Sequence, residues 1–285
     1  MTQWVGTGMG MHAKTRQLLK EAGTILRARH PMTVRQVFYQ LVSRHVIENT
    51  RSQDQTVSNL LVNARKTGAI PWEWIEDRLR RPRTVSMWDG LADFAEAAHH
   101  AYRQDVWQTQ PGLVEVWLEK DALSGIVEDL LGPYGVALNV GRGYEGWDSI
   151  RNAALRYGDG SHVTVLYLGD LDPSGEDMVR SLKERLGFFD SRPEIVKVCL
   201  TLEDVERHQL PPDFTKTSDT RRAQFVKRFG DIAVELDALP VQVLQEKIQH
   251  AVESRMDLAA LEAVRGLEAL ERADLSKRLT RPANE

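Results

Sequence analysis

Strands and helices are expected to alternate through the second half of the chain. Four apolar runs of strand length are separated by segments in which apolar residues recur at helical spacing. The expected strands are Leu113–Leu118, Val136–Val140, Val163–Leu168 and Ile195–Leu200, and the expected helices between them are Ala122–Leu131, Trp147–Tyr157 and Gly175–Leu186. Parallel strands need a crossover of this length, usually a helix. The sequence therefore predicts an α/β domain with a parallel sheet over residues 111–285, followed within that range by a helical C-terminal tail.

The first 110 residues are expected to form a separate, mainly helical domain. Their periodicity predicts helices at Ala13–His30, Val34–Arg44 and Gln53–Thr67. Thr33 is placed to cap the second helix, and Ile70–Ile75 and Thr84–Met87 are expected to be short strands around a basic segment. Three helices followed by a hairpin are typical of a winged helix-turn-helix, so residues 1–110 are interpreted as a DNA-binding winged-helix domain.

Basic side chains are concentrated where such a domain would meet DNA. The candidates are Arg65 and Lys66 at the end of the third helix, and Arg78, Arg80, Arg81 and Arg83 in the expected wing. Residues 1–112 hold 15 Lys and Arg against 10 Asp and Glu, whereas the remainder holds 22 against 31. A basic front half suits phosphates and an acidic back half suits cations. A chance fluctuation of surface charge explains the same asymmetry, and the count alone does not separate the two.

Composition excludes some classes of protein. The single cysteine, Cys199, excludes an internal disulfide and any multi-cysteine zinc site. The longest apolar stretch, around Val163–Leu168, is far shorter than the roughly 20 residues that span a bilayer. The first residues lack the charged, then apolar layout of a signal peptide. We therefore expect a cytoplasmic protein that does not associate with membranes.

Three carboxylates follow strands of the predicted sheet. Glu119 comes directly after the first strand, and Asp170 and Asp172 come just after the third. Polar residues at the carboxyl ends of parallel strands line the ligand crevice of an open α/β sheet. Mg²⁺ prefers such hard oxygen ligands, so the three residues are candidate magnesium ligands. In the alternative, one aspartate caps the next helix and the other lies in a solvated turn; the third carboxylate on the same sheet weighs against this.

Three motifs in this region resemble those of a known family. They are Glu119-Lys-Asp-Ala122, Gly141-Arg-Gly-Tyr144 and Asp170-Leu-Asp-Pro-Ser-Gly175. Their order and positions resemble a Toprim domain, most closely that of the topoisomerase VI A subunit and the related meiotic double-strand-break protein. The resemblance implies that Glu119, Asp170 and Asp172 hold Mg²⁺ beside the scissile phosphate. It also implies that the glycine-rich loop, with Arg142, lies at the opposite lip of a DNA groove.

A tyrosine in the front domain matches the same family. Thr33-Val-Arg-Gln-Val-Phe-Tyr39 resembles the segment that carries the family's nucleophile, with Gln36 in place of the usual acid. By that resemblance Tyr39 attacks phosphorus and forms a 5′-phosphotyrosyl link. Arg35 lies four residues earlier, on the same helical face, where it would favour the phenolate and hold the phosphate. The neighbouring residues are apolar, however, and an aromatic residue in such a helix is commonly part of the core.

The resemblance predicts an Mg²⁺-dependent enzyme that cleaves double-stranded DNA. Its catalytic residues would be Tyr39, Arg35 and Glu119. Cutting both strands needs two sites, so we expect a homodimer, associated with the nucleoid, in which Tyr39 of one chain works near the acidic site of the other. The chain has no P-loop, so any ATPase would be a separate partner.

Two alternatives stay open. One is a Toprim nuclease for defence or plasmid control, in which metal-activated water attacks and Tyr39 only packs. The other is a DNA-binding protein with an inactive site. The resemblance weakens downstream. Glu235 and Asp237 there either add to the acidic cluster or, as we expect, lie in a capped, solvated helix start.

Overall fold

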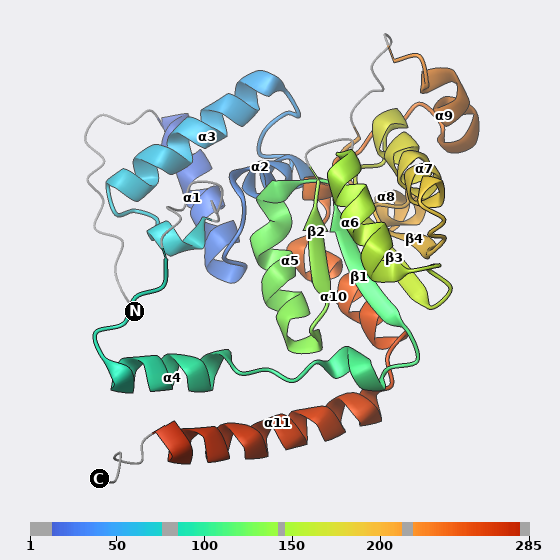
Figure 1. The fold of residues 1–285 in the computed structure, drawn as a ribbon. Helices are drawn as coiled ribbons and strands as arrows, with labels where there is room; N and C mark the ends of the chain where they lie inside the picture. Colours follow the sequence, from blue (N-terminus) through green and yellow to red (C-terminus); the bar gives the residue numbers. More distant parts are fainter. Residues whose placement is uncertain (1–12, 76–84, 142–145, 213–218, 280–285) are drawn as a thin grey trace.

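A four-stranded parallel sheet forms the centre of the molecule. The computed structural model describes residues 13–75, 85–141, 146–212 and 219–279. The strands are β1 (Leu113–Leu118), β2 (Ala137–Val140), β3 (Val163–Leu168) and β4 (Glu194–Cys199), arranged in the order β2-β1-β3-β4 (Figure 1). All neighbouring strands run parallel. The predicted α/β class is therefore confirmed.

Helices cover both faces of this sheet. On one face, α6 (Trp147–Tyr157) and α7 (Pro173–Phe188) pack against Trp117, Val165 and Tyr167. The residues between these, such as Val116 and Leu166, point to the other face and join the core formed with α5 (Ser124–Leu131) and α10 (Val241–Glu253). This alternation follows from the two-residue period of a strand. The two central strands are consequently apolar almost throughout, and polar side chains are confined to their ends and to Glu115.

The front of the chain contains the three expected helices. They are α1 (Ala13–Ala28), α2 (Val34–Ser43) and α3 (Arg51–Lys66). Thr33 caps α2 as predicted: its hydroxyl accepts a hydrogen bond from the Gln36 backbone, and the Gln36 side chain accepts one from the Thr33 backbone. The buried residues of these helices belong to the same core cluster as α5 and α10. The front helices are thus packed onto the α/β part rather than held at a distance.

The first expected wing strand is not formed. Within Ile70–Ile75 the chain makes a 3-10 helix, η1 (Trp72–Trp74), and only Ile75 makes an isolated bridge, to Met32. Pro71 precedes η1; its fixed φ and missing N–H suit the start of a turn and not a ladder. Of the second expected strand, residues 85–87 are not in a strand, and residue 84 lies outside the described residues. The described residues therefore do not establish a winged helix.

Two helices form an arm beside the body of the molecule. α4 (Leu91–Ala101) lies along α11 (Leu258–Leu279), as Figure 1 shows. The Tyr102 hydroxyl donates to Glu271, and the Gln104 backbone N donates to Glu268 at 2.8 Å. The remaining elements are α8 (Leu202–His208), α9 (Arg222–Phe229), η2 (Val106–Thr109), η3 (Asp121–Leu123), η4 (Gly132–Tyr134) and η5 (Leu236–Ala238). None of the described helices combines the length and apolarity needed to cross a bilayer.

Candidate functional site

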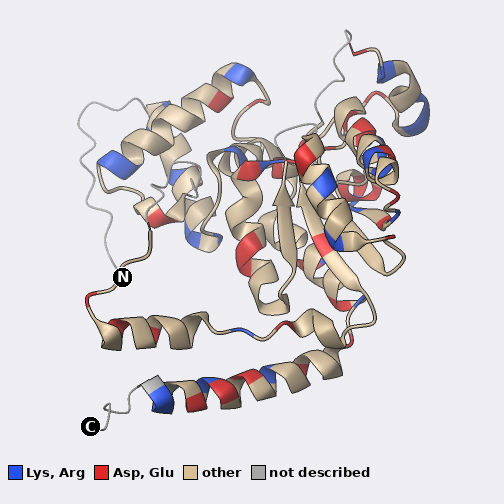
Figure 2. Ribbon diagram, in the orientation of Figure 1, with Lys and Arg blue, Asp and Glu red and all other residues tan. Residues whose placement is uncertain are grey.

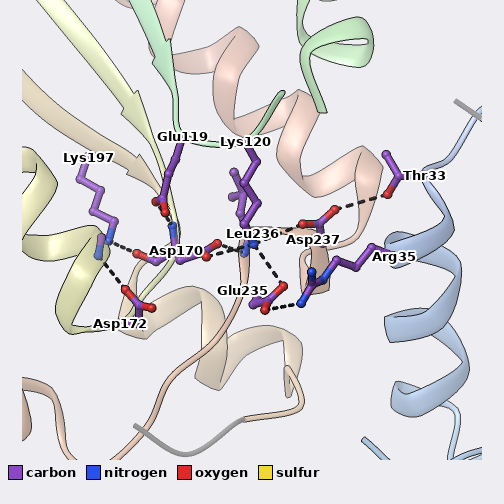
Figure 3. Close-up of polar contacts among 11 residues, drawn as sticks. Thr33, Arg35, Glu119, Lys120, Asp170, Asp172, Lys197, Glu235, Leu236 and Asp237 are labelled. Atoms are coloured by element: carbon purple, nitrogen blue, oxygen red, sulfur yellow. Dashed lines mark hydrogen bonds and ion pairs between the residues drawn. The ribbon is translucent and has the colours of Figure 1, made fainter. Parts of the chain in front are cut away.

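Glu119 and Asp170 lie side by side where β1 and β3 end. The strands pair in register up to Leu118 and Leu168, so the residues that follow leave the sheet together. The Glu119 backbone N donates to the Leu168 carbonyl at 2.9 Å. In return, the Asp170 backbone N donates to Glu119 Oε2 at 3.0 Å (Figure 3). The parallel register therefore brings two of the three predicted ligands together.

Two glycines make this close approach possible. A Cβ on Gly169 would lie 2.6 Å from Glu119 Oε2 and 2.5 Å from the Tyr167 ring. A Cβ on Gly175 would lie 2.4 Å from the Asp170 carbonyl oxygen. All three distances are shorter than real Cβ contacts, so the turn from β3 into α7 depends on glycine at these positions.

Asp172 has one structural contact at the start of α7. Its Oδ1 accepts a hydrogen bond from the Gly175 backbone N at 2.6 Å, so it caps the helix, as the alternative interpretation of this residue expected. Its other oxygen, Oδ2, has no hydrogen bond or ion pair within the described part of the chain, and the same holds for Glu119 Oε1. Capping and cation binding are compatible, because a carboxylate has two oxygens.

The Glu119 carboxyl is electrostatically unfavourable. Burial, followed by repulsion from Asp170 and a smaller contribution from Asp172, raises the pKa of Glu119 to about 7. The backbone hydrogen bond from Asp170 and the charge of Lys120 oppose this rise but do not cancel it. A divalent cation among these oxygens would relieve the repulsion.

Lys120 supplies the main positive charge of the cluster. Its Nζ lies 2.9 Å from Asp170 Oδ2, 3.1 Å from Glu235 Oε2 and 3.4 Å from Asp237 Oδ2. Burial by itself lowers the pKa of Lys120, but the three carboxylates together raise it above its ordinary value. The other oxygen of Asp170 accepts a hydrogen bond from the Leu236 backbone N at 2.7 Å. Both oxygens of Asp170 therefore have protein partners.

The segment around η5 belongs to this cluster. The expectation that Asp237 lies in a solvated helix start is wrong, because its side chain is 1% exposed. Its Oδ1 accepts a hydrogen bond from the Thr33 hydroxyl at 3.3 Å. Glu235 pairs with Arg35 at 2.5 Å. Acidic and basic residues consequently alternate where α2 meets the end of the sheet (Figure 2). Sequence reasoning missed these contacts because they join residues about 200 positions apart, and no local pattern indicates them.

Tyr39 is packed in the core of the front helices. Tyr39 is 3% exposed, and the Arg35 side chain lies near its hydroxyl. Burial, and then the charge of Glu235, raise the pKa of Tyr39 above its ordinary value, and the opposing effects of Arg35 and Lys120 are smaller. In this arrangement Arg35 does not produce the phenolate that the sequence led us to expect, because burial and the charge of Glu235 outweigh its effect.

The candidate DNA-binding residues are only partly described. Arg65 is half-buried, with its guanidinium 4.9 Å from the centre of the Trp72 ring, and Lys66 is exposed. Five candidates lie outside the described residues: Arg78, Arg80, Arg81, Arg83 and Arg142. The glycine-rich loop starts beside the acidic cluster, since the Gly141 backbone N donates to the Leu118 carbonyl at 2.7 Å.

The donor set fits magnesium, although the side chains do not yet surround an ion. No three His, Cys, Asp or Glu side chains of the described ranges are gathered so that they hold a metal as they stand. Lys120 and the helix cap explain this, because they occupy oxygens of Asp170 and Asp172. Mg²⁺ binds through one or two carboxylates and keeps several waters, so Glu119 Oε1 and Asp172 Oδ2 offer suitable donors.

Neither protein-family models nor curated protein sequences give a match to this chain.

Proposed function

We propose that this chain is an Mg²⁺-dependent DNA-cleaving enzyme of the topoisomerase VI A type, with its cation at Glu119, Asp170 and Asp172. The observation that supports this best is the pairing of Glu119 and Asp170 at the carboxyl ends of two central parallel strands. Buried carboxylates that repel one another, with perturbed pKa values, are typical of functional sites. The Toprim-like motifs fall on these same strand ends.

In the covalent route, the Tyr39 oxygen forms a bond to phosphorus, and the bond from phosphorus to the 3′ oxygen breaks. The phenolic proton is lost, the departing 3′ oxygen gains a proton, and the 5′ phosphate remains on the protein. Arg35 holds a phosphate oxygen, and Glu119 acts in catalysis through the cation that it would hold. When bound, Mg²⁺ supplies positive charge that offsets the charge on the phosphoryl oxygens.

A hydrolytic route is the second candidate, and the burial of Tyr39 favours it. A buried phenol with a raised pKa is a poor nucleophile, whereas attack by water does not require Tyr39 to leave the core. Water then adds to phosphorus, the 3′ oxygen leaves as a hydroxyl, and the product carries a free 5′ phosphate. An inactive DNA-binding protein is the third candidate; the contacts of Lys120 with Asp170 favour it over a metal site.

The proposed substrate and partners follow from the same chemistry. The proposed domains are a front domain, residues 1–110, and a Toprim domain, residues 111–285. Double-stranded DNA would contact the front domain and would be cut at the site on the Toprim domain. Cutting both strands calls for a homodimer, and strand passage calls for a separate ATPase. A protein with these roles would act in the cytoplasm, on the nucleoid.

Plasmid cleavage tests the proposal. Supercoiled plasmid is incubated with the protein and Mg²⁺, and the products are compared before and after protease digestion. The covalent route predicts DNA that stays bound to protein until digestion, lost in Tyr39→Phe and in Asp170→Ala. Tyr157→Phe is a matched control, because Tyr157 is equally buried but hydrogen-bonds Glu115.

The other outcomes separate the alternatives. Free 5′-phosphate ends, produced equally by Tyr39→Phe, support hydrolysis. Gel retardation without cleavage in any cation supports the binding protein and contradicts the proposed enzyme.

A further inference from the structure

We propose that Lys120 is a positioning residue that couples cation binding at the acidic cluster to the docking of α2, the helix that carries Tyr39. This inference rests on the proposed function, because it takes the cation site as its starting point. It goes further in naming how that site would control access to the tyrosine.

Lys120 connects two segments that have different tasks. On one side its Nζ contacts Asp170, a proposed cation ligand, at 2.9 Å. On the other side it contacts Glu235 at 3.1 Å and Asp237 at 3.4 Å (Figure 3). The Lys120 side chain is only 22% exposed, so water screens these contacts weakly.

The carboxylates around η5 in turn hold the beginning of α2. Glu235 Oε1 pairs with Arg35, and Asp237 Oδ1 accepts a hydrogen bond from Thr33, the capping residue of α2. Thus an unbroken series of contacts runs from Asp170 through Lys120 and Glu235 to Arg35. Arg35 also lies close enough to Tyr39 for its charge to act on the phenol, so the series ends beside the proposed nucleophile.

Charge determines the direction of the coupling. Five carboxylates gather here, namely Glu119, Asp170, Asp172, Glu235 and Asp237. Among the described residues, the side chains of Lys120 and Arg35 form ion pairs with them. A divalent cation on Asp170 competes with the Lys120 ammonium for the same carboxylate and repels it. The Lys120 ammonium then interacts more strongly with Glu235 and Asp237. Because these carboxylates are shared, they bind Arg35 and Thr33 less strongly. Cation binding would therefore loosen the start of α2 and expose Tyr39.

A second lysine provides a matched control. Lys197 Nζ lies 2.7 Å from the Asp170 carbonyl oxygen and 2.6 Å from Glu176 Oε1, and its side chain is 14% exposed. Lys197 therefore has the same charge as Lys120, is buried to a similar extent, and also contacts Asp170. Within the described part of the chain its polar contacts do not include the η5 segment, so it is outside the series that reaches α2.

The test combines two measurements on the full chain. Electron paramagnetic resonance with Mn²⁺, used in place of Mg²⁺, measures cation binding, and hydrogen exchange measures the opening of residues 33–43. In the unaltered protein, saturating Mn²⁺ is expected to speed exchange at the start of α2 by about fivefold or more, the lower end of ordinary coupling between sites. In Lys120→Met the cation still binds, more tightly, but exchange in α2 no longer responds to it.

The control separates coupling from simple charge. Lys197→Met also removes one positive charge near Asp170, so it too is expected to bind Mn²⁺ more tightly, but the response of α2 is retained. If Lys120→Met does not fold, Glu235→Gln interrupts the same series from the other side and is expected to abolish the response.

Each remaining outcome is decisive. If Mn²⁺ binds and exchange in α2 is unchanged or slower, or if Lys120→Met responds as the unaltered protein does, the coupling is wrong and the proposed cation site stands. If no Mn²⁺ binds, both the cation site and the coupling are wrong.

Discussion

Glu115 and Glu119 lie on the same chain segment, one within β1 and one just beyond it, and their surroundings are opposite. Glu115 is 2% exposed and accepts four hydrogen bonds. Asn139 and Tyr157 each donate one at 2.6 Å, and Arg156 donates two, at 2.9 and 3.0 Å. Glu119 faces Asp170 and has an elevated pKa. A carboxylate whose partners satisfy it stabilises the fold, whereas one placed against a like charge needs another ligand.

Removal of the satisfied carboxylate is expected to have the largest effect on stability. Glu115→Ala leaves the Tyr157 hydroxyl, Asn139 and Arg156 without their common acceptor, so the free energy of unfolding should fall by about 3 kcal/mol. Urea denaturation measures this. Glu206→Ala, at an exposed position of α8, is the control and should change stability by less than about 0.5 kcal/mol. Equal losses in the two variants would contradict the comparison.

The second prediction concerns the turn that brings Glu119 to Asp170. Gly169→Ala places a methyl group against Glu119 Oε2 and the Tyr167 ring, and is expected to cost about 2 kcal/mol and to weaken cation binding. Gly187→Ala, within α7, meets no atom within 4 Å and should be neutral or slightly stabilising. Denaturation and Mn²⁺ titration of both variants measure the two effects. A Gly169→Ala protein with unaltered cation affinity would show that the close approach is dispensable.

The third prediction is a dependence of stability on pH. The pKa of Glu119 is about 7 in the folded chain and 4.5 ordinarily, so its ionisation is harder in the folded state. Stability is therefore lost as the pH rises from about 4.5 through 7, on the order of 1–3 kcal/mol, and Glu119→Gln lacks this loss. The difference in unfolding free energy between the two proteins, measured with a chelator from pH 5 to 8, should decline. A constant difference would contradict the raised pKa, and added Mg²⁺ should reduce the decline.

The sequence predicted the sheet well because local patterns determine it. The strands Leu113–Leu118 and Val163–Leu168 were located to the residue, and the meeting of Glu119 with Asp170 follows from the parallel arrangement alone. The expected strand at Ile70–Ile75 was wrong. The prediction gave the alternating apolar residues more weight than Pro71, whereas in the structure Pro71 begins a 3-10 turn. Such errors arise where a turn residue competes with periodicity.

The rest of the site was beyond local patterns. Lys120 stands beside a predicted ligand, but nothing in the sequence indicates that its ammonium lies among carboxylates from two distant segments. The burial of Asp237 likewise depends on the packing of α2 against η5. Such contacts follow from the tertiary fold, which a single sequence does not specify by its spacing.

The central claim is that Glu119 and Asp170 bind one divalent cation, and Mn²⁺ binding at pH 8 tests it most directly. We predict one ion per chain in the unaltered protein, displaced by Mg²⁺, with affinity reduced at least about tenfold in both Glu119→Gln and Asp170→Asn. Asp159→Asn, an exposed carboxylate held by Ser161, is the control and should bind as the unaltered protein does. An absence of bound Mn²⁺, or full binding by both site variants, would contradict the account.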